Sequence, residues 1–418
     1  MSAPTVEANG QPAKAAPETG ETPPQNRLIK ELLSSSVTTT VLAIVLSMLI
    51  GGLLIAFTDP RVIEASGYFF QRPGDTLVAL WDAISGGYAA LFRGSVFNYE
   101  APSFLRAIKP LSDTLNFATP LIMAGLGVGL AFRVGLFNIG GRGQMLMGAA
   151  ASGFVMFGVD LPLFVHLPLV VIAGIAGGAI WGGIVGFLKA RTGAHEVILT
   201  IMLNFVAFYF VAWLLSTPGL LMRPGGNQPI SPVTPESAKF PLLFGAPLTT
   251  HWGFIAALLA ALFVWWLMER SSLGFRMRAV GENPHAARAS GIKVDRIIFY
   301  AMAIAGGLAG LAGANQVAGT VTTGFGSHID AGIGFDAITV ALLGRSRAWG
   351  VVAAGILFGA LKAGSFTMQI AEDIPVDIVL VVQALIVLFI AAPPLVRTVF
   401  GLKRFDRVHA LQQKGASA

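Results

Sequence analysis

The feature that most constrains this chain is a succession of apolar runs, each about 20 residues long. Runs such as Val37–Phe57 and Leu111–Phe132 have the length that an α-helix needs to cross the hydrocarbon core of a bilayer. Strands of a membrane β-barrel would instead appear as short segments of alternating hydrophobicity, and none are evident. Only 12% of the 418 residues are charged, about half the share of a soluble domain. The sequence therefore predicts an all-α polytopic membrane protein.

The positions of Lys and Arg orient the predicted helices. Arg27 and Lys30 precede the first run, six basic residues lie within 269–296, and others lie within 397–418. Short loops rich in Lys and Arg stay on the cytoplasmic side. We therefore predict about ten spans, some of them broken or re-entrant, with both termini in the cytoplasm. The predicted spans are 37–57, 111–132, 136–157, 167–188, 195–215, 252–268, 297–317, 335–343, 349–366 and 375–392.

Composition divides the chain into five parts. Residues 1–26 are rich in Ala, Pro, Glu and Thr and are predicted to be a disordered cytoplasmic tail. The first transmembrane helix lies within 27–57, and 58–110 is predicted to be an external segment with an interfacial helix, a plain loop helix being the alternative. The transmembrane domain covers 111–396, and 397–418 forms a basic cytoplasmic tail.

The basic segment Glu269–Arg296 contains a short helix with recognisable ends. Asn283 suits the N-cap, Pro284 suits the first helical position, and Gly291 suits the stop. A short capped helix on a cytoplasmic loop is suited to docking. The alternative is an ordinary basic loop that only fixes the membrane topology.

Polar residues within the apolar runs indicate where a solute could pass. Gly135–Gly148 and Gly332–Arg345 are glycine-rich, so the helix is expected to open there, which a membrane tolerates only beside protein or a water-filled cavity. Two such segments in corresponding halves point to a binding site at the membrane midplane. Hydrogen bonds between helices are the alternative role for the amides. The predicted pathway residues are Asn138, Gln144, Asn204 and Asp336.

Two glycine patterns concern packing. Gly174, Gly178, Gly182 and Gly186 form a stripe that lets a neighbouring helix approach closely. The pattern G-x-x-x-G-x-L-K-A occurs twice, at 182–190 and 355–363, five predicted spans apart. An inverted repeat of the kind found in transporters is one explanation, and chance is the other.

Several chemistries are excluded. The chain has no cysteine, so it has no disulfide or thiolate site. No Gly-Lys dipeptide occurs, so the chain has no Walker A loop, and H-E-x-x-H and G-x-S-x-G motifs are missing. We therefore predict no catalytic residue, no metal ligand and no enzyme activity. The net charge of +6 comes from loops and tails and does not indicate nucleic-acid binding.

Four segments resemble permeases of ATP-binding cassette (ABC) importers, in the branch for sugars, nucleosides and branched-chain amino acids. Ala279–Ile292 resembles the coupling loop of that family. Phe137–Ala149, His195–Asn204 and Gly334–Arg345 resemble signatures of its nucleoside-type members, and the resemblance covers roughly residues 110–395. Within Phe137–Ala149, Gly141-Arg142 stands where the family usually has Ala-Glu, which reverses a charge.

The resemblance implies a multi-pass permease of the bacterial inner membrane that imports nucleosides. Its implied partners are an ATPase subunit that binds ATP and Mg, a second permease subunit, an external substrate-binding lipoprotein and membrane lipid. No cofactor is expected in this chain. The implied ATPase-coupling residues are Glu282, Asn283, Pro284, Ala286, Ala287 and Gly291.

Two other functions remain open at this point. The first is a permease for ribose or another sugar, because such relatives share the same skeleton. The second is an ion-coupled secondary transporter that uses Asp336 to couple the ion.

Overall fold

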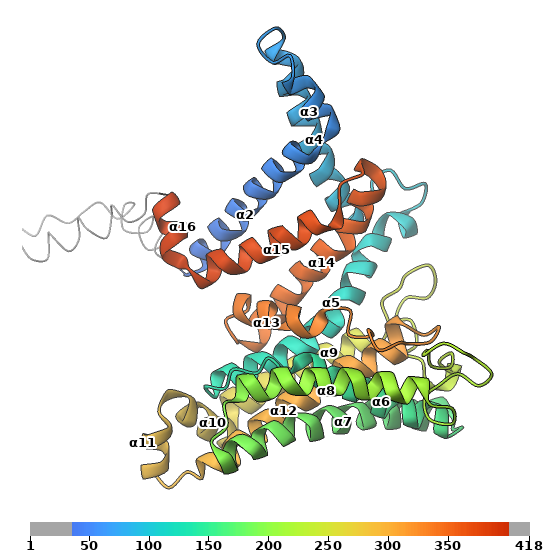
Figure 1. Cartoon of the computed structure of the whole chain (residues 1–418), viewed down its shortest axis with the longest axis vertical. Helices are drawn as coiled ribbons and strands as arrows, with labels where there is room; N and C mark the ends of the chain where they lie inside the picture. Colours follow the sequence, from blue (N-terminus) through green and yellow to red (C-terminus); the bar gives the residue numbers. More distant parts are fainter. Residues whose placement is uncertain (1–35, 401–418) are drawn as a thin grey trace, which may run out of the picture. The chain divides into compact units, whose positions relative to one another are not determined.

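The computed structural model describes residues 36–400. Apart from one isolated bridge between Leu242 and His251, every regular element there is helical, which confirms the all-α prediction for this part of the chain. The predicted tail at 1–26 and residues 401–418 lie outside the described residues. The α-helices are α2 (Ser36–Thr58), α3 (Pro60–Ser66), α4 (Pro73–Ser95), α5 (Phe104–Arg133), α6 (Gly141–Gly158), α7 (Leu163–Thr192), α8 (Glu196–Ser216), α9 (Gly253–Arg270), α10 (Ser272–Glu282), α11 (Pro284–Ala289), α12 (Val294–Asn315), α13 (Ile333–Leu343), α14 (Ala348–Glu372), α15 (Val376–Ala391) and α16 (Pro393–Val399) (Figure 1). Residues 43–392 form one compact unit, to which the packing described below belongs.

Seven of the described helices are long and apolar enough to cross a membrane: α2, α5, α7, α8, α9, α12 and α14. The other three predicted spans correspond to α6, α13 and α15. Helices α13 and α15 are apolar but have only 11 and 16 residues. Helix α13 is short because Gly332, with φ of +80°, starts it and Gly344 ends it. The structure thus supports seven long spans, against the ten that the sequence predicts.

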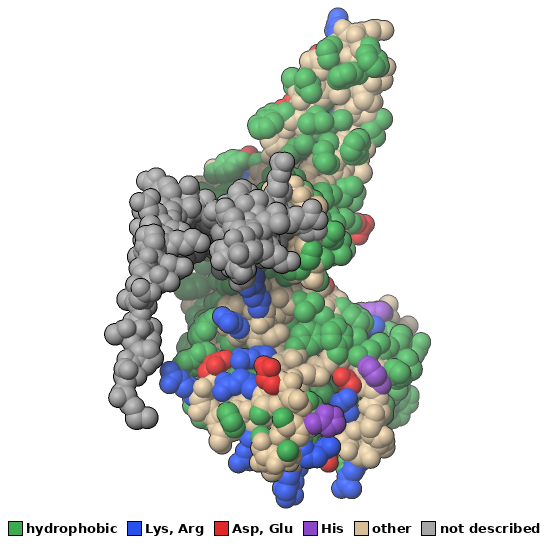
Figure 2. Space-filling model, turned by 90° about the vertical axis from the view of Figure 1, so that its left-hand side faces the viewer, with side chains coloured by type: hydrophobic (Ala, Val, Ile, Leu, Met, Phe, Trp, Pro, Cys, Tyr) green, Lys and Arg blue, Asp and Glu red, His purple; other side chains and the backbone are tan. Residues whose placement is uncertain are grey.

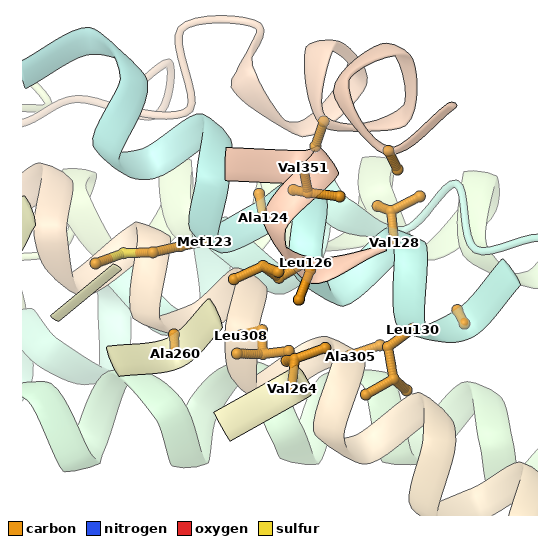
Figure 3. Close-up of a cluster of buried hydrophobic side chains, with 14 of the residues drawn as sticks. Met123, Ala124, Leu126, Val128, Leu130, Ala260, Val264, Ala305, Leu308 and Val351 are labelled. Carbon is orange, nitrogen blue, oxygen red and sulfur yellow. The ribbon is translucent and has the colours of Figure 1, made fainter. Parts of the chain in front are cut away.

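Helix α5 forms the centre of the largest hydrophobic cluster. Met123, Leu126 and Leu130 are at most 1% exposed, and they pack against side chains of α9, α12 and α14 such as Val264 and Leu308 (Figure 3). Lipid tails are as apolar as these side chains, so close packing rather than escape from water stabilises such a contact. The surroundings of α5 are therefore densely filled.

The predicted glycine stripe packs α7 against α12. A Cβ atom on Gly178 would lie 2.2 Å from the carbonyl oxygen of Gly306, and one on Gly182 would lie 2.3 Å from that of Met302. Any larger residue would push the two backbones apart. The packing role predicted for the stripe is confirmed.

The two copies of the G-x-x-x-G-x-L-K-A pattern lie in α7 and α14, and both helices use them for close packing. Helix α7 packs along α12, and α14 packs along α5. In α14, a Cβ on Gly359 would lie 2.7 Å from the carbonyl oxygen of Thr114 in α5. Helix α6 likewise contacts α12, and α13 contacts α5. The second half of the bundle thus repeats the contacts of the first with the partners exchanged.

The proline-rich loop between α8 and α9 is bound to the segment that follows α12. The Phe240 amide donates to Ala318 O at 2.8 Å, and the Ser231 amide donates to Phe325 O at 2.9 Å. The Arg223 guanidinium donates to Thr323 O at 2.9 Å. The loop is therefore a fixed cover over this end of the helices.

Candidate functional site: two interrupted helix starts and a basic helical segment

The helix opens between α5 and α6, as the sequence predicts. The backbone turns at Gly135, with φ of +77°, and becomes helical again at Gly141. The buried Asn138 side chain accepts a hydrogen bond from the Gly140 amide at 2.9 Å and donates one to Gln144 Oε1 at 3.1 Å. The Asn138 side chain therefore fixes the backbone just before α6, and the Gln144 side chain holds Asn138 in place.

Asn204 of α8 holds the same opening from the other side. Its Oδ1 accepts from the Gly143 amide at 2.8 Å, and its Nδ2 donates to Ile139 O at 3.0 Å. A Cβ on Gly143 would lie 2.9 Å from that Oδ1, so the contact requires glycine. The structure thus brings Asn138, Gln144 and Asn204 together around one opened stretch of backbone.

The opening predicted within Gly332–Arg345 is not found, because Ile333–Leu343 forms the unbroken helix α13; the interruption lies before it, and the start of α13 touches the start of α6. A Cβ on Gly141 would lie 2.9 Å from Gly334 O, and one on Gly334 would lie 2.4 Å from the Arg142 Cα. The backbones of α6 and α13 are therefore in direct contact where each helix begins.

Arg142 has an acidic partner that the sequence analysis missed. Its Nε lies 3.3 Å from Asp330 Oδ2, and the Asp330 side chain is only 4% exposed. The Arg142 guanidinium also lies over the ring of Phe208, 5.1 Å from the centroid, and Phe208 meets His328 edge-on at 5.0 Å. A single acidic residue two positions before Gly332 was the available signal for this partner. The charge reversal at position 142 is therefore balanced within the chain.

Asp336 forms no hydrogen bond with the three amide side chains. It is half-buried in the first turn of α13, where its own amide donates to Gly332 O at 3.1 Å. The charged groups that act on its carboxylate are Lys362 and Asp330. Lys362 Nζ donates to Ala331 O at 3.2 Å, just before α13. Asp336 therefore belongs to the Asp330 side of the contact between the two helix starts.

A second polar cluster lies where α12 ends in the π-helical turn Gln316–Thr320. Asn315, Gln316 and His251 are at most 3% exposed. Both side-chain amide atoms of Asn315, Gln316 Oε1 and His251 Nε2 have no hydrogen-bond partner within residues 36–400. Unpaired buried groups are costly, and π-turns often occur at functional sites. In that same range, no group of three or more His, Asp and Glu could hold a metal ion.

The basic segment folds into two short helices, α10 and α11, at one end of the bundle (Figure 1). Asn283 caps α11, its Oδ1 accepting from the amides of His285 at 2.9 Å and Ala286 at 3.1 Å, and Gly291 follows with φ of +83°. The predicted short helix and its ends are confirmed. Glu282, Asn283, Pro284 and Ala286 are exposed, whereas Ala287 is buried. Lys and Arg side chains gather over this part of the surface (Figure 2).

The segment formed by α10 and α11 is joined to the core through α5. Glu269 forms ion pairs with Arg133 at 2.6 Å and with Arg278 at 3.2 Å. A Cβ on Gly281 would lie 2.2 Å from the Arg133 carbonyl oxygen. The end of α5 therefore contacts α10 directly.

Comparison with known proteins shows a family match over most of the chain. The model of the family described as "Branched-chain amino acid transport system / permease component" matches residues 111–391. The chain is 39% identical to a guanosine ABC transporter permease protein, NupP, of Bacillus subtilis. The alignment covers 80% of this chain and 91% of that protein. It is 37% identical to a glucose ABC transporter permease protein, TsgB13, of Haloferax volcanii, over 79% of this chain and 90% of that protein.

A third similar protein is a nucleoside ABC transporter permease protein, NupB, of Lactococcus lactis subsp. cremoris. It is 34% identical over 76% of this chain and 88% of that protein. No solved structure matches the chain. Because the family model covers more than half of the chain, and these relatives are matched over most of their length, the chain belongs to the ABC transporter permease family, as a multi-pass membrane component and not as an enzyme.

Proposed function

We propose that this chain forms the translocation pathway of an ABC importer for nucleosides. The observation that carries the proposal is the 39% identity to a guanosine permease over 91% of that protein's length. The nucleoside permease of Lactococcus supports the same substrate class. The glucose permease, at 37% identity, makes a sugar the second candidate.

The pathway is proposed to pass the contact between the two interrupted helix starts. Asn138, Gln144 and Asn204 hold the opened backbone of α6, and Asp336 lies at the start of α13. In the bilayer core an open backbone is tolerated beside a pathway or buried in protein. In this proposal the three amides shape the wall, and they meet the solute when α6 and α13 move apart.

Coupling to ATP hydrolysis is assigned to α11 and its flanks. As a permease of an ABC transporter, the chain acts with an ATPase subunit, which binds the ATP and Mg, and with a paired permease. The exposed Glu282, Asn283, Pro284 and Ala286 would contact the ATPase. Ala287 would anchor α11 on the protein, and Gly291 would end the helix.

The topology and partners follow from this assignment. Helices α10 and α11 face the cytoplasm of a bacterial inner membrane, with both termini on that side, and α6, α13 and α15 complete ten spans arranged as an inverted repeat. The external substrate-binding lipoprotein docks on the opposite side. In each of three organisms two permease proteins match this chain, at 39% and 27%, 37% and 29%, and 34% and 27% identity. We therefore infer a second, different permease as the partner.

Uptake of labelled guanosine by cells with and without the gene tests the proposal. We expect guanosine uptake to fall to background without the gene, because the paired permease cannot form the pathway of this importer without this chain. Excess unlabelled glucose or ribose should not compete. Loss of glucose or ribose uptake, with guanosine uptake intact, would keep the permease assignment and refute the nucleoside substrate.

A further inference from the structure

A cavity of about 430 Å³ lies between the end of α4, the first half of α5 and the second half of α14. Its volume is within the range of small-molecule sites. It lies away from the contact between the helix starts. Measured along α5, its Asp113 lies about 30 Å from Arg133, the residue whose carbonyl lies against Gly281 of α10. Under the proposed topology the cavity therefore belongs to the outer half of the permease.

One wall of the cavity is aromatic. The rings of Phe117 in α5 and Phe366 in α14 stack at 6.0 Å between centroids, with 24° between their planes. Phe366 is 48% exposed although it has this partner. Such a pair offers a flat apolar face on which a planar heterocycle can stack.

The polar part of the lining lies beside this aromatic pair, on the same side of α5. Asp113 and Asn116 lie three residues apart on the helix, and Phe117 follows. The Asp113 carboxylate accepts from Lys109 Nζ and from Thr249 Oγ1, each at 2.7 Å, which leaves lone pairs on both oxygens. Asn116 Oδ1 accepts from Thr320 Oγ1 at 3.4 Å, and the Asn116 Nδ2 donates no hydrogen bond within the described chain.

The charges of the lining are mostly paired. Lys109 is paired with Asp113, and Arg93 with Glu100. Arg106 lines the cavity without an ion pair among the described residues. One free guanidinium beside paired charges favours a neutral, hydrogen-bonding ligand or one with an electron-rich edge over a cation.

One hydrogen bond joins the lining of the cavity to the polar cluster at the end of α12. Asn116 is hydrogen-bonded to Thr320, the last residue of the π-helical turn that begins with Gln316. The unpartnered amide atoms of Asn315 and Gln316 lie at the start of that turn. A polar solute moving inward past Asn116 would therefore meet buried hydrogen-bonding groups that have no other partner.

From these observations we propose that the cavity is the outer solute-binding site of the permease and that it takes a nucleoside. The base stacks on Phe117 and Phe366, and its polar edge bonds to Asp113 and Asn116. A carboxylate accepts the adjacent N–H donors of guanine, and an amide can both donate and accept. This assignment rests on the proposed function, nucleoside import, and names the residues that would bind the nucleoside.

Because the chain has no native cysteine, a single introduced thiol can report on occupancy. The test uses Thr367→Cys, which lines the cavity, in the assembled transporter in lipid nanodiscs, with a maleimide as the thiol reagent. We expect saturating guanosine to slow the modification at least about fivefold and glucose to leave it unchanged. In the control, Thr192→Cys, an exposed threonine at the end of α7, the rate should not respond to guanosine.

Side-chain removal gives a second readout in the same complex. Adding Phe366→Ala or Asn116→Ala to Thr367→Cys should raise the guanosine concentration needed for protection about tenfold. The matched controls Phe70→Ala and Asn227→Ala, both exposed and remote from the lining, should not.

The outcomes separate the two proposals. Guanosine uptake without any protection of the cavity thiol, or protection by glucose and not by guanosine, would overturn the cavity assignment. Protection by guanosine in a transporter that does not import it would support the binding site and overturn the proposed function.

Discussion

At the start of α6, Arg142 occupies a position where the nucleoside-type signature that Phe137–Ala149 resembles has a glutamate. In the sequence alone, this reversal puts the role of the position in doubt. The structure shows that Asp330, from the segment before α13, lies 3.3 Å from Arg142 Nε and is almost fully buried. A buried charge without a partner costs several kcal/mol, so each of these two residues requires the other.

Arg142→Gln should therefore destabilise the protein by about 3 kcal/mol, because it leaves the Asp330 carboxylate buried and unpaired. Asp330→Asn should do the same to Arg142. The double variant should recover most of the loss, since it removes both charges. Thermal melting of the purified transporter measures this coupling.

The control for this pair is Arg72→Gln, an exposed arginine without an ion pair in the described range. Its melting temperature should match that of the parent chain. Additive losses in the double variant would show that Arg142 and Asp330 do not act as a pair.

His251 predicts a pH response at the covered end of the bundle. Burial lowers the pKa of its imidazole to about 4, and its ring stacks on Phe240. In the opened state the pKa returns to about 6.5. The closed state, in which the loop between α8 and α9 covers His251, therefore binds fewer protons than the opened state. Its stability relative to the opened state is complete above pH 6.5 and falls as the pH drops toward 4. At pH 5 the loss is about 2 kcal/mol.

Hydrogen exchange checks this response at the Phe240 and Trp252 amides, which donate to Ala318 O and Pro241 O. Their protection should fall between pH 7 and pH 5. His251→Asn keeps an acceptor for the Gly253 amide but does not titrate, so its protection should be lower and independent of pH. An equal pH response in both proteins would exclude His251 as its source.

At the scale of elements, residue types at neighbouring positions predicted the features that depend only on neighbouring residues, such as the ends of a helix. Asn283, Pro284 and Gly291 define the ends of α11, and the structure has the helix where they place it. The pairing of Asn204 with Ile139 and Gly143 could not be predicted in the same way, because it joins residues 61 and 65 positions apart. The π-helical turn after Asn315 also has no sequence signal, since its geometry depends on the packed cover above it.

The cap of α11 provides a test of coupling. Asn283→Ala removes both hydrogen bonds to the first turn and should weaken the short helix by about 1 kcal/mol. We expect substrate-stimulated ATPase activity of the reconstituted transporter to fall severalfold. Asn283→Asp keeps the acceptor and should retain the activity. Equal ATPase activity in Asn283→Ala and Asn283→Asp, at equal amounts of protein in the membrane, would show that the cap of α11 has no part in coupling.

At the scale of the whole molecule, the number of spans was harder to predict than their existence. Hydropathy identifies long helices such as α7 and α12, but α13 has only 11 residues and depends on its neighbours for burial. The repeated G-x-x-x-G-x-L-K-A pattern gave a weak signal of symmetry. The structure adds that α7 packs on α12 and α14 packs on α5, an exchange of partners that no single segment encodes.

If this exchange reflects two equivalent halves, both glycine contacts should be equally indispensable. Gly186 and Gly359 occupy the same position of the repeated pattern. A Cβ atom on Gly186 would lie 2.9 Å from the Phe299 Cα in α12, and one on Gly359 would lie 2.7 Å from the Thr114 carbonyl oxygen in α5. Gly186→Leu and Gly359→Leu should each abolish the monodisperse protein in size-exclusion chromatography, because each glycine meets the backbone of its neighbour. Gly158→Leu, at a site with no atom within 4 Å, should leave the profile unchanged. Tolerance of leucine at only one of the first two positions would mean that the halves are not equivalent, and that one helix pair alone determines the assembly of the bundle.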